Sequence, residues 1–333
     1  IRRSKMLKEI RGGAGMKEIT IKAYAKINLS IDVLGERPDG YHEVLMVMEQ
    51  VDLFDLVKVA WQADHENAEV PQKDEEGKYI QINLSTNLPY LPVDSRNIAY
   101  KAAELMAKQF GKEEAGRIDI EVEKSIPVAA GLAGGSANCA AVLHALNRLW
   151  DLNLELETLM KLGAGLGADV PFCLAGQAAL NEELNLKEEP MAGTCAVASG
   201  IGEQLEMTIP LKAWVLLSKP PINLSTAEVY GGLNLNEITE HPNTAELVAG
   251  LREGNYYKIS KNMTNVLENY SLKEYPTIMY TKNKIVQEGK AYKALMSGSG
   301  PTVFGLYTSK RKGIAAYSKL KTLNKETFLI KTL

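Results

Sequence analysis

Apolar and polar residues alternate strictly between Ile19 and Val33, which is the clearest pattern along the chain. The apolar positions are Ile19, Ile21, Ala23, Ala25, Ile27, Leu29, Ile31 and Val33. A period of two predicts a β-strand with one buried face and one polar face, and Lys26 and Asn28 then project together from the polar face. A turn is predicted next at Pro38-Asp39-Gly40, because Pro fixes its own φ and Gly accepts a positive φ.

The rest of the chain mixes strands and helices. Short apolar runs predict strands at residues 51–61, 79–85, 117–123, 214–217, 293–296 and 302–307. Apolar residues at helical spacing predict helices at 97–110, 139–150, 154–162, 226–232, 244–251 and 276–288. The polar stretch between the first two of these strands is predicted to be a solvated loop. Because no regular βαβ rhythm runs through these elements, the pattern favours an α+β fold over a doubly wound sheet.

Composition and charge narrow the classes of partner. The 333 residues suffice for two domains, and the net charge of -3 gives no electrostatic reason to expect nucleic acid or an anionic membrane as partner. No apolar stretch approaches the length of a transmembrane helix. Three cysteines without CxxC spacing argue against a disulfide framework or a zinc site and favour a reducing compartment, so we expect a cytoplasmic protein.

The strongest chemical signal is the loop from Gly131 to Ser136, which joins a predicted strand to a predicted helix. Glycines let the backbone approach a phosphate, and the helix N-terminus adds about half a positive charge. The loop is neither a Walker A motif nor a dinucleotide fingerprint, because GxxxxGK[ST] and the G-x-G-x-x-G spacing are both missing here. A tight turn with close helix packing is the alternative explanation.

Two charged residues are candidates for chemistry at that phosphate. Asp169 follows a glycine-rich turn and could accept a proton from a hydroxyl or hold a metal, or could be a turn residue bonded to its own backbone. Lys26 could orient such a carboxylate, or could be a surface lysine. His42 has no second His or Cys at ligand spacing, so a hydrogen-bonding role beside a stacking Tyr41 is favoured over a metal role.

A second glycine-rich segment, Ser297-Gly298-Ser299-Gly300, lies between two predicted strands. It is either a hairpin turn or a second anion-binding loop.

Taken together, these segments resemble the galactokinase, homoserine kinase, mevalonate kinase and phosphomevalonate kinase (GHMP) family. The matching segments, in chain order, are residues 25–29 (AKINL), 38–42 (PDGYH), 127–141, 167–172 (GADVPF), 224–227 (LSTA) and 296–300 (MSGSG). The resemblance implies a two-domain GHMP-kinase-like fold with the active site in the interdomain cleft. We expect an N-terminal extension at 1–15, an ATP-binding domain at 16–205 and a C-terminal domain at 206–333.

The DGYH motif close behind AKINL is similar to one branch of that family. The resemblance implies that ATP, with Mg²⁺, phosphorylates the 2-hydroxyl of a cytidine-diphosphate-linked methylerythritol, in the non-mevalonate route to isoprenoids. It implies a monomer or homodimer that binds this small molecule and neither nucleic acid nor membrane. The alternatives are a GHMP kinase for homoserine, mevalonate or a sugar, and a non-catalytic nucleotide-binding protein of the same fold.

The resemblance also implies roles for single residues. Asp169 is expected to be the catalytic base and Lys26 its partner. The expected cofactor-binding residues are Asn97, Pro127, Ala130, Gly131, Leu132, Ala133, Gly134, Gly135, Ser136 and Ala137. The expected substrate-binding residues are Asn28, Tyr41, His42, Thr226, Tyr230, Gly298 and Ser299. No metal ligand is predicted.

Three departures from the family pattern matter. Ala133 stands where many members have glycine, which is compatible with a negative φ at that position. Ala137 stands where many have serine, so a hydroxyl that could approach Mg²⁺ is missing. The acidic segment from Asn181 to Glu189 looks inserted, and we expect a solvent-exposed loop there.

Overall fold

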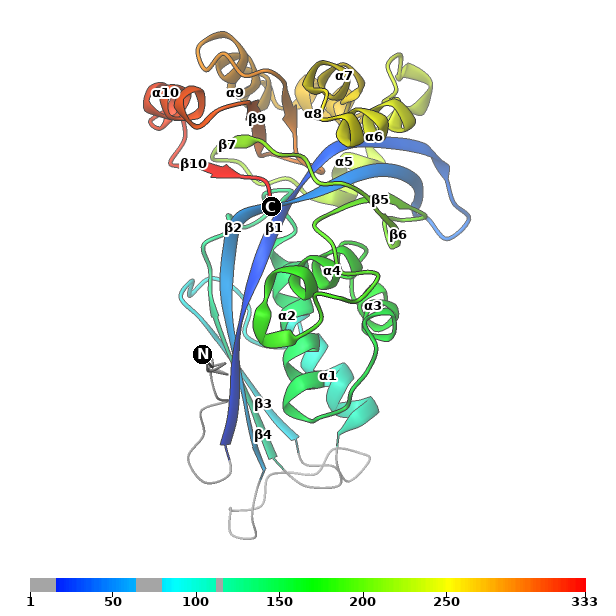
Figure 1. Ribbon diagram of the computed structural model, residues 1–333, viewed down its shortest axis with the longest axis vertical. Helices are drawn as coiled ribbons and strands as arrows, with labels where there is room; N and C mark the ends of the chain where they lie inside the picture. Colours follow the sequence, from blue (N-terminus) through cyan, green and yellow to red (C-terminus); the bar gives the residue numbers. More distant parts are fainter. Residues whose placement is uncertain (1–15, 64–79, 112–115) are drawn as a thin grey trace, which may run out of the picture.

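The computed structural model describes residues 16–63, 80–111 and 116–333. The predicted N-terminal extension at 1–15 and most of the predicted solvated loop lie outside these residues. Within them, the strands form a six-stranded sheet and a four-stranded sheet. Helices accompany both sheets (Figure 1), and the predicted α+β class is confirmed.

A long antiparallel hairpin runs through both halves of the molecule (Figure 1). It consists of β1 (Met16–Glu36) and β2 (His42–Ala63). The remaining strands of the six-stranded sheet are β3 (Ile80–Thr86), β4 (Gly116–Glu123), β5 (Cys195–Ser199) and β6 (Gln204–Met207). Because β4 pairs with the later half of β2 and β5 with its earlier half, the two occupy successive lengths of β2.

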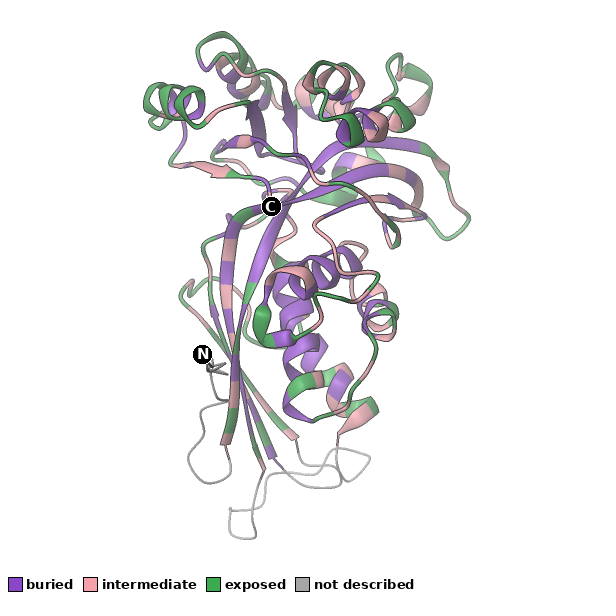
Figure 2. Cartoon of the chain, in the orientation of Figure 1, coloured by how far each residue is buried: buried purple, intermediate pink, exposed green. Residues whose placement is uncertain are grey.

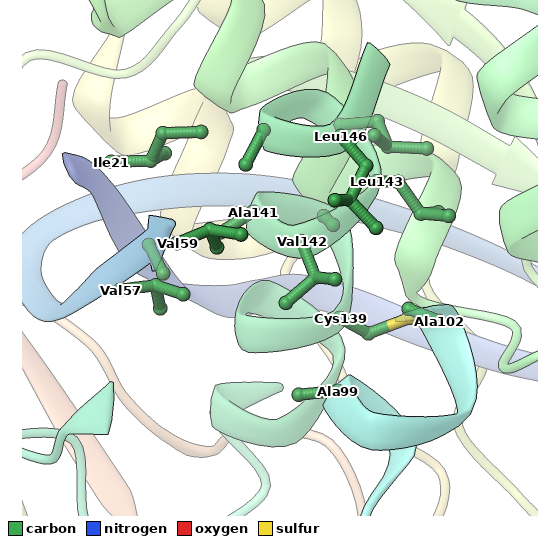
Figure 3. Close-up of a cluster of buried hydrophobic side chains, with 14 of the residues drawn as sticks. Ile21, Val57, Val59, Ala99, Ala102, Cys139, Ala141, Val142, Leu143 and Leu146 are labelled. Atoms are coloured by element: carbon green, nitrogen blue, oxygen red, sulfur yellow. The ribbon is translucent and has the colours of Figure 1, made fainter. Parts of the chain in front are cut away.

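Four helices cover one face of this sheet (Figure 1). They are α1 (Ile98–Phe110), α2 (Gly134–Leu149), α3 (Leu156–Ala164) and α4 (Val170–Leu180). In Figure 3 the side chains of α2 lie among residues of the two long strands and of α1. Small residues such as Ala141 of α2 and Ala99 and Ala102 of α1 let these elements approach closely, since they carry little volume.

The second half of the molecule is built on the four-stranded sheet, in the order β10-β7-β9-β8. Its strands are β7 (Trp214–Lys219), β8 (Ala294–Met296), β9 (Val303–Tyr307) and β10 (Glu326–Lys331). Its helices are α5 (Thr226–Gly231), α6 (Thr244–Glu253), α7 (Tyr256–Asn262), α8 (Glu268–Glu274), α9 (Pro276–Gln287) and α10 (Lys310–Leu320). The predicted domain boundary after residue 205 falls within β6, and the division into 16–205 and 206–333 stays a prediction.

The predicted alternation of β1 is present, but its polar face is not a solvent face. Thr20 and Lys22 are exposed, whereas Lys26, Asn28, Ser30 and Asp32 are buried. The upper part of the hairpin is buried along its length (Figure 2), because the second half of the molecule packs beside it. The burial of a lysine and an asparagine on this face marks the position of the site.

The expected solvent-exposed loop at 181–189 is only partly correct. A 3-10 turn, Glu182–Leu184, occupies its start, and several of its charged residues are exposed. Asn181 and Leu184 are buried, however, and Asn181 exchanges hydrogen bonds with the backbone of Lys22 in β1. The segment is therefore hydrogen-bonded to the sheet through its first residue, Asn181.

Candidate active site

One cavity of about 810 Å³ lies between the two halves of the molecule, with walls from both. It is lined by every predicted catalytic, cofactor-binding and substrate-binding residue except Ala137. Ala137 is fully buried behind the wall, and its backbone N–H donates to the carbonyl oxygen of Ala133. The structure thus brings together residues from strand β1, two glycine-rich loops and helix α5.

Lys26 and Asp169 meet in this cavity. The Lys26 Nζ lies 3.4 Å from Asp169 Oδ1 and donates to Asn28 Oδ1 at 2.7 Å. The lysine side chain is 4% exposed, so Lys26 is not the surface residue that was its alternative explanation. Its ammonium is thus oriented by Asn28 and faces the carboxylate at short range, where burial strengthens the attraction.

The carboxylate of Asp169 is available for chemistry. Asp169 directly precedes α4, but its side chain makes no capping hydrogen bond to that helix. The alternative that Asp169 is bonded to its own turn is therefore wrong. At 30% exposure, it faces the cavity with one oxygen near Lys26. A carboxylate held in this way can accept a proton from a hydroxyl placed beside it.

The glycine loop adopts a strained path before α2. Ala129, Gly131 and Ala133 have φ values of 50°, 71° and 57°. The negative φ with which an alanine at position 133 would be compatible is not present, because the chain turns in the left-handed region to enter the helix. The backbone N–H groups of Gly134 and Gly135 follow in the first turn of α2, where they have no intrahelical partner. They are ready donors for a phosphate at the cavity wall.

The second glycine-rich loop packs directly on the first. It is the turn of the β8–β9 hairpin, so the hairpin explanation is confirmed, while a role in anion binding stays a prediction. Ser297 Oγ donates to the carbonyl oxygen of Gly131 at 2.9 Å. A Cβ placed on Gly131 would lie 2.1 Å from the Ser297 carbonyl oxygen, so only glycine permits this close approach.

Along the rest of the cavity wall, side chains from the two halves face each other. The rings of His42 and Tyr230 lie 5.1 Å apart at 42°. Thr226 Oγ1 and Ser299 Oγ share a hydrogen bond of 3.0 Å, and Tyr41 stands at the rim with 59% of its surface exposed. Burial, and then the charge of Asp169, raise the pKa of Tyr230 above its ordinary range, so its hydroxyl remains neutral.

Comparison with known proteins gives the family. The family models described as "GHMP kinases N terminal domain" and "GHMP kinases C terminal" match residues 97–177 and 247–326. The 4-diphosphocytidyl-2-C-methyl-D-erythritol kinase of Alkaliphilus metalliredigens is 43% identical over 95% of this chain and 97% of its own. The chain belongs to the GHMP kinase family. The kinase of the same name from Alkaliphilus oremlandii is 44% identical over the same shares of the two chains.

Solved structures place the GHMP kinase fold on the whole chain. A crystal structure of 4-(cytidine 5'-diphospho)-2C-methyl-D-erythritol kinase matches with a TM-score of 0.71 and 25% identity, over 94% of this chain and 99% of that one. Homoserine kinase from Cytophaga hutchinsonii matches with a TM-score of 0.64 and 18% identity, over 95% of each chain. The second match concerns the fold alone.

Sequence reasoning missed several residues that line the cavity of this GHMP kinase. Leu91, Pro92, Arg96, Lys124 and Asn138 line the cavity without having been predicted. A signal existed for Lys124, which is a lone cation at the end of β4 shortly before the glycine loop. Arg96 and the two apolar residues precede α1 in an irregular segment, where no periodicity indicates which way a side chain points.

Asn97 lines the cavity and also caps helix α1. Its Oδ1 accepts from the N–H of Ala99 as the N-cap of α1, and its Nδ2 donates to the carbonyl oxygen of Pro92. Its predicted role in cofactor binding stays a prediction.

None of the helices in the described part of the chain is long and apolar enough to cross a membrane.

Proposed function

We propose that this GHMP kinase transfers the γ-phosphoryl group of ATP to the 2-hydroxyl of 4-diphosphocytidyl-2-C-methyl-D-erythritol, a step of the non-mevalonate route to isoprenoids. The observation that carries the proposal is the pairing of Lys26 with Asp169 between the glycine loop and the His42–Tyr230 end of the cavity. The relatives at 43% and 44% identity bear the name of this kinase.

In this mechanism the acceptor hydroxyl donates its hydrogen bond to Asp169. The carboxylate takes the proton as the hydroxyl oxygen attacks the γ-phosphorus and ADP leaves, and Lys26 orients the carboxylate. The N–H groups of Gly134 and Gly135 donate hydrogen bonds to the oxygens of the transferring phosphoryl group. Phosphoryl transfer depends mainly on positioning of the reactants and on stabilisation of charge, and this arrangement provides both.

The residues present also fit a magnesium ion. Mg²⁺ usually takes one or two protein carboxylates together with phosphate oxygens, and Asp169 is the one carboxylate among the described residues that line the cavity. The hydroxyl of Ser136 lies on the same side, since a Cβ on Gly167 would be 3.9 Å from its Oγ. Asp169 and Ser136 would hold the ion, which when bound neutralises charge on the phosphates of ATP.

The opposite end of the cavity suits a pyrimidine nucleotide. His42 and the neutral Tyr230 offer ring faces and hydrogen-bonding groups close together, and Tyr41 can close over a base from the rim. Thr226 and Ser299 add paired hydroxyls from the second half of the molecule. We assign the cytidine diphosphate to this end, with the methylerythritol between it and Asp169.

The test is a substrate panel with Mg-ATP, in which ADP release is followed for 4-diphosphocytidyl-2-C-methyl-D-erythritol, homoserine, mevalonate and galactose. We expect rapid turnover with the first alone, and phosphorus NMR should place the new phosphate on the 2-hydroxyl. Turnover of another acceptor at a higher kcat/KM would overturn the proposed substrate. ATP hydrolysis that no acceptor stimulates would overturn the proposed transfer.

We further propose a cytoplasmic location and a monomer or homodimer. The location is supported by Cys139, Cys173 and Cys195, which are buried and free. Burial raises the pKa of each thiol, so these residues are packing groups and not reactive thiolates.

A further inference from the structure

Beside the glycine loop, and outside the cavity lining, lies a fully buried carboxylate, that of Asp55 in β2. Its Oδ1 accepts from the backbone N–H groups of Ser125 and Ile126 at 2.7 and 2.8 Å. Its Oδ2 accepts from Asn138 Nδ2 at 2.8 Å and from the ammonium of Lys124. Four donors converge on one buried anion, which is a charge-assisted arrangement that fixes all four in place.

The strand pairing explains why a carboxylate is needed here. The ladder between β2 and β4 ends at the pair Leu56–Glu123. The chain then leaves the sheet. The N–H of Lys124 donates to Asn87 Oδ1, and the N–H groups of Ser125 and Ile126 have no strand partner. Asp55, the residue of β2 next to the last pair, supplies the acceptor that the ladder no longer provides.

The same carboxylate also reaches the helix beyond the loop. Asn138 belongs to α2, which begins at Gly134, while Ser125 and Ile126 precede the loop. Asp55 therefore ties the chain on both sides of the glycine loop to one rigid strand. The bonds to Asp55 thus hold the two points between which the loop runs.

Lys124, which is bonded to Asp55, also lines the cavity. Its side chain is 6% exposed, and its Nζ also donates to Asn138 Oδ1 at 3.0 Å. A Cβ on Gly134 would lie 3.1 Å from that Nζ, so the ammonium packs against the first residue of α2. The positive charge thus lies at the helix N-terminus, where phosphates are expected, and Asp55 determines its position.

We propose that Asp55 is a positioning residue for ATP, acting through the glycine loop and Lys124 without touching the nucleotide. The proposal rests on the assignment of ATP to this end of the cavity. It predicts that losing the Asp55 charge weakens ATP binding specifically, while the acceptor end keeps its affinity, because neither His42 nor Tyr230 is among the groups bonded to Asp55.

The test is Asp55→Asn in the full chain, with ATP affinity measured by calorimetry and KM measured for both substrates. The asparagine oxygen can still accept from the two backbone N–H groups, but Lys124 loses its counter-ion. We expect the Kd and KM for ATP to rise about tenfold, because misplacement of phosphate donors is costly. The KM for 4-diphosphocytidyl-2-C-methyl-D-erythritol should stay within about twofold.

Glu326→Gln is the matched control, because Glu326 pairs with the nearly buried Lys219 in the four-stranded sheet, away from the cavity lining. Glu326→Gln should lower the unfolding midpoint without changing ATP affinity.

An unchanged Kd for ATP in Asp55→Asn, or an equal loss of affinity for both substrates, would overturn the proposal. If Asp55→Asn does not fold, Asn138→Ala removes one of the four bonds, and a folded Asn138→Ala with unchanged ATP affinity would overturn it equally.

The calorimetric result does not depend on turnover. The wild-type protein could fail to phosphorylate the proposed acceptor while the Asp55→Asn variant still binds ATP about tenfold more weakly. That result would support Asp55 as a positioning residue for ATP and would show that the proposed acceptor is wrong.

Discussion

The two ends of the cavity are built in different ways. The end to which we assign ATP is mostly one continuous stretch, residues 127–136, which presents backbone N–H groups and is flanked by residues that bind Asp55. The acceptor end is assembled from side chains of separate segments, with His42 after the first turn, Tyr230 on α5 and Ser299 in the β8–β9 turn. A phosphate is recognised by local backbone geometry, whereas a particular acceptor requires side chains that only the fold brings together.

The largest effect is expected where the two ends meet, at Asp169. Asp169→Asn should lower kcat about 10²- to 10⁴-fold, equivalent to about 3–5 kcal/mol, because the general base is lost. The affinity for ATP without magnesium should be unchanged, as measured by calorimetry beside steady-state kinetics with Mg-ATP. Asp151→Asn is the control, since Asp151 is exposed and pairs with Lys17 outside the cavity. A near-normal kcat in Asp169→Asn would contradict the assignment of the base.

The first half of the molecule is also expected to be sensitive to acid, through His144 of α2. Burial lowers the pKa of His144 to about 4, and its Nε2 contacts the carbonyl oxygen of Leu174 at 3.1 Å. Between pH 6.5 and 4 the unfolded chain binds a proton here that the folded chain does not. The free energy of unfolding should therefore fall by up to about 3 kcal/mol as the pH decreases through this window.

Urea unfolding at pH 7 and at pH 4.5 measures this loss. His144→Gln keeps an N–H that can reach Leu174 but cannot titrate, so its stability should depend less on pH. The same pH dependence in both proteins would show that other groups are responsible.

A smaller effect, confined to the acceptor end, is expected for His42. His42→Ala removes the ring beside Tyr230 and should raise the KM for the acceptor about tenfold. The KM for ATP, measured in the same assays, serves as the control and should not change. Equal changes in both constants would remove the distinction between the two ends.

The smallest effect concerns backbone strain in the glycine loop. Ala133→Gly should raise the free energy of unfolding by up to about 1 kcal/mol, because φ at this position is 57° and glycine adopts it without strain. Ala137→Gly, within α2, should lower it by about 1 kcal/mol. Chemical denaturation of both variants tests the sign, and destabilisation by both would show that Ala133 is not strained.

Helices and strands were predictable from the sequence where apolar residues recur with the period of a strand or a helix. The alternation of β1 and the periodicity of α1 and α2 predicted those elements, although much of β1 and nearly all of α2 are buried. Helix α4 was missed because it is buried on nearly all sides, so its apolar residues show no helical period. Short elements such as β5 and β6 offer too few residues for a pattern, and their pairing with β2 decides their conformation.

The sequence by itself determined the glycine loop, its position before a helix and the motifs that carry the family resemblance, because these depend on residues adjacent in the chain. Only the tertiary structure decided that Lys26 lies beside Asp169, that His42 faces Tyr230 and that Asp55 anchors the loop. These contacts join residues far apart in sequence. Their distances are set by how the long hairpin, the helices and the second sheet pack, and no local spacing of residues specifies that packing.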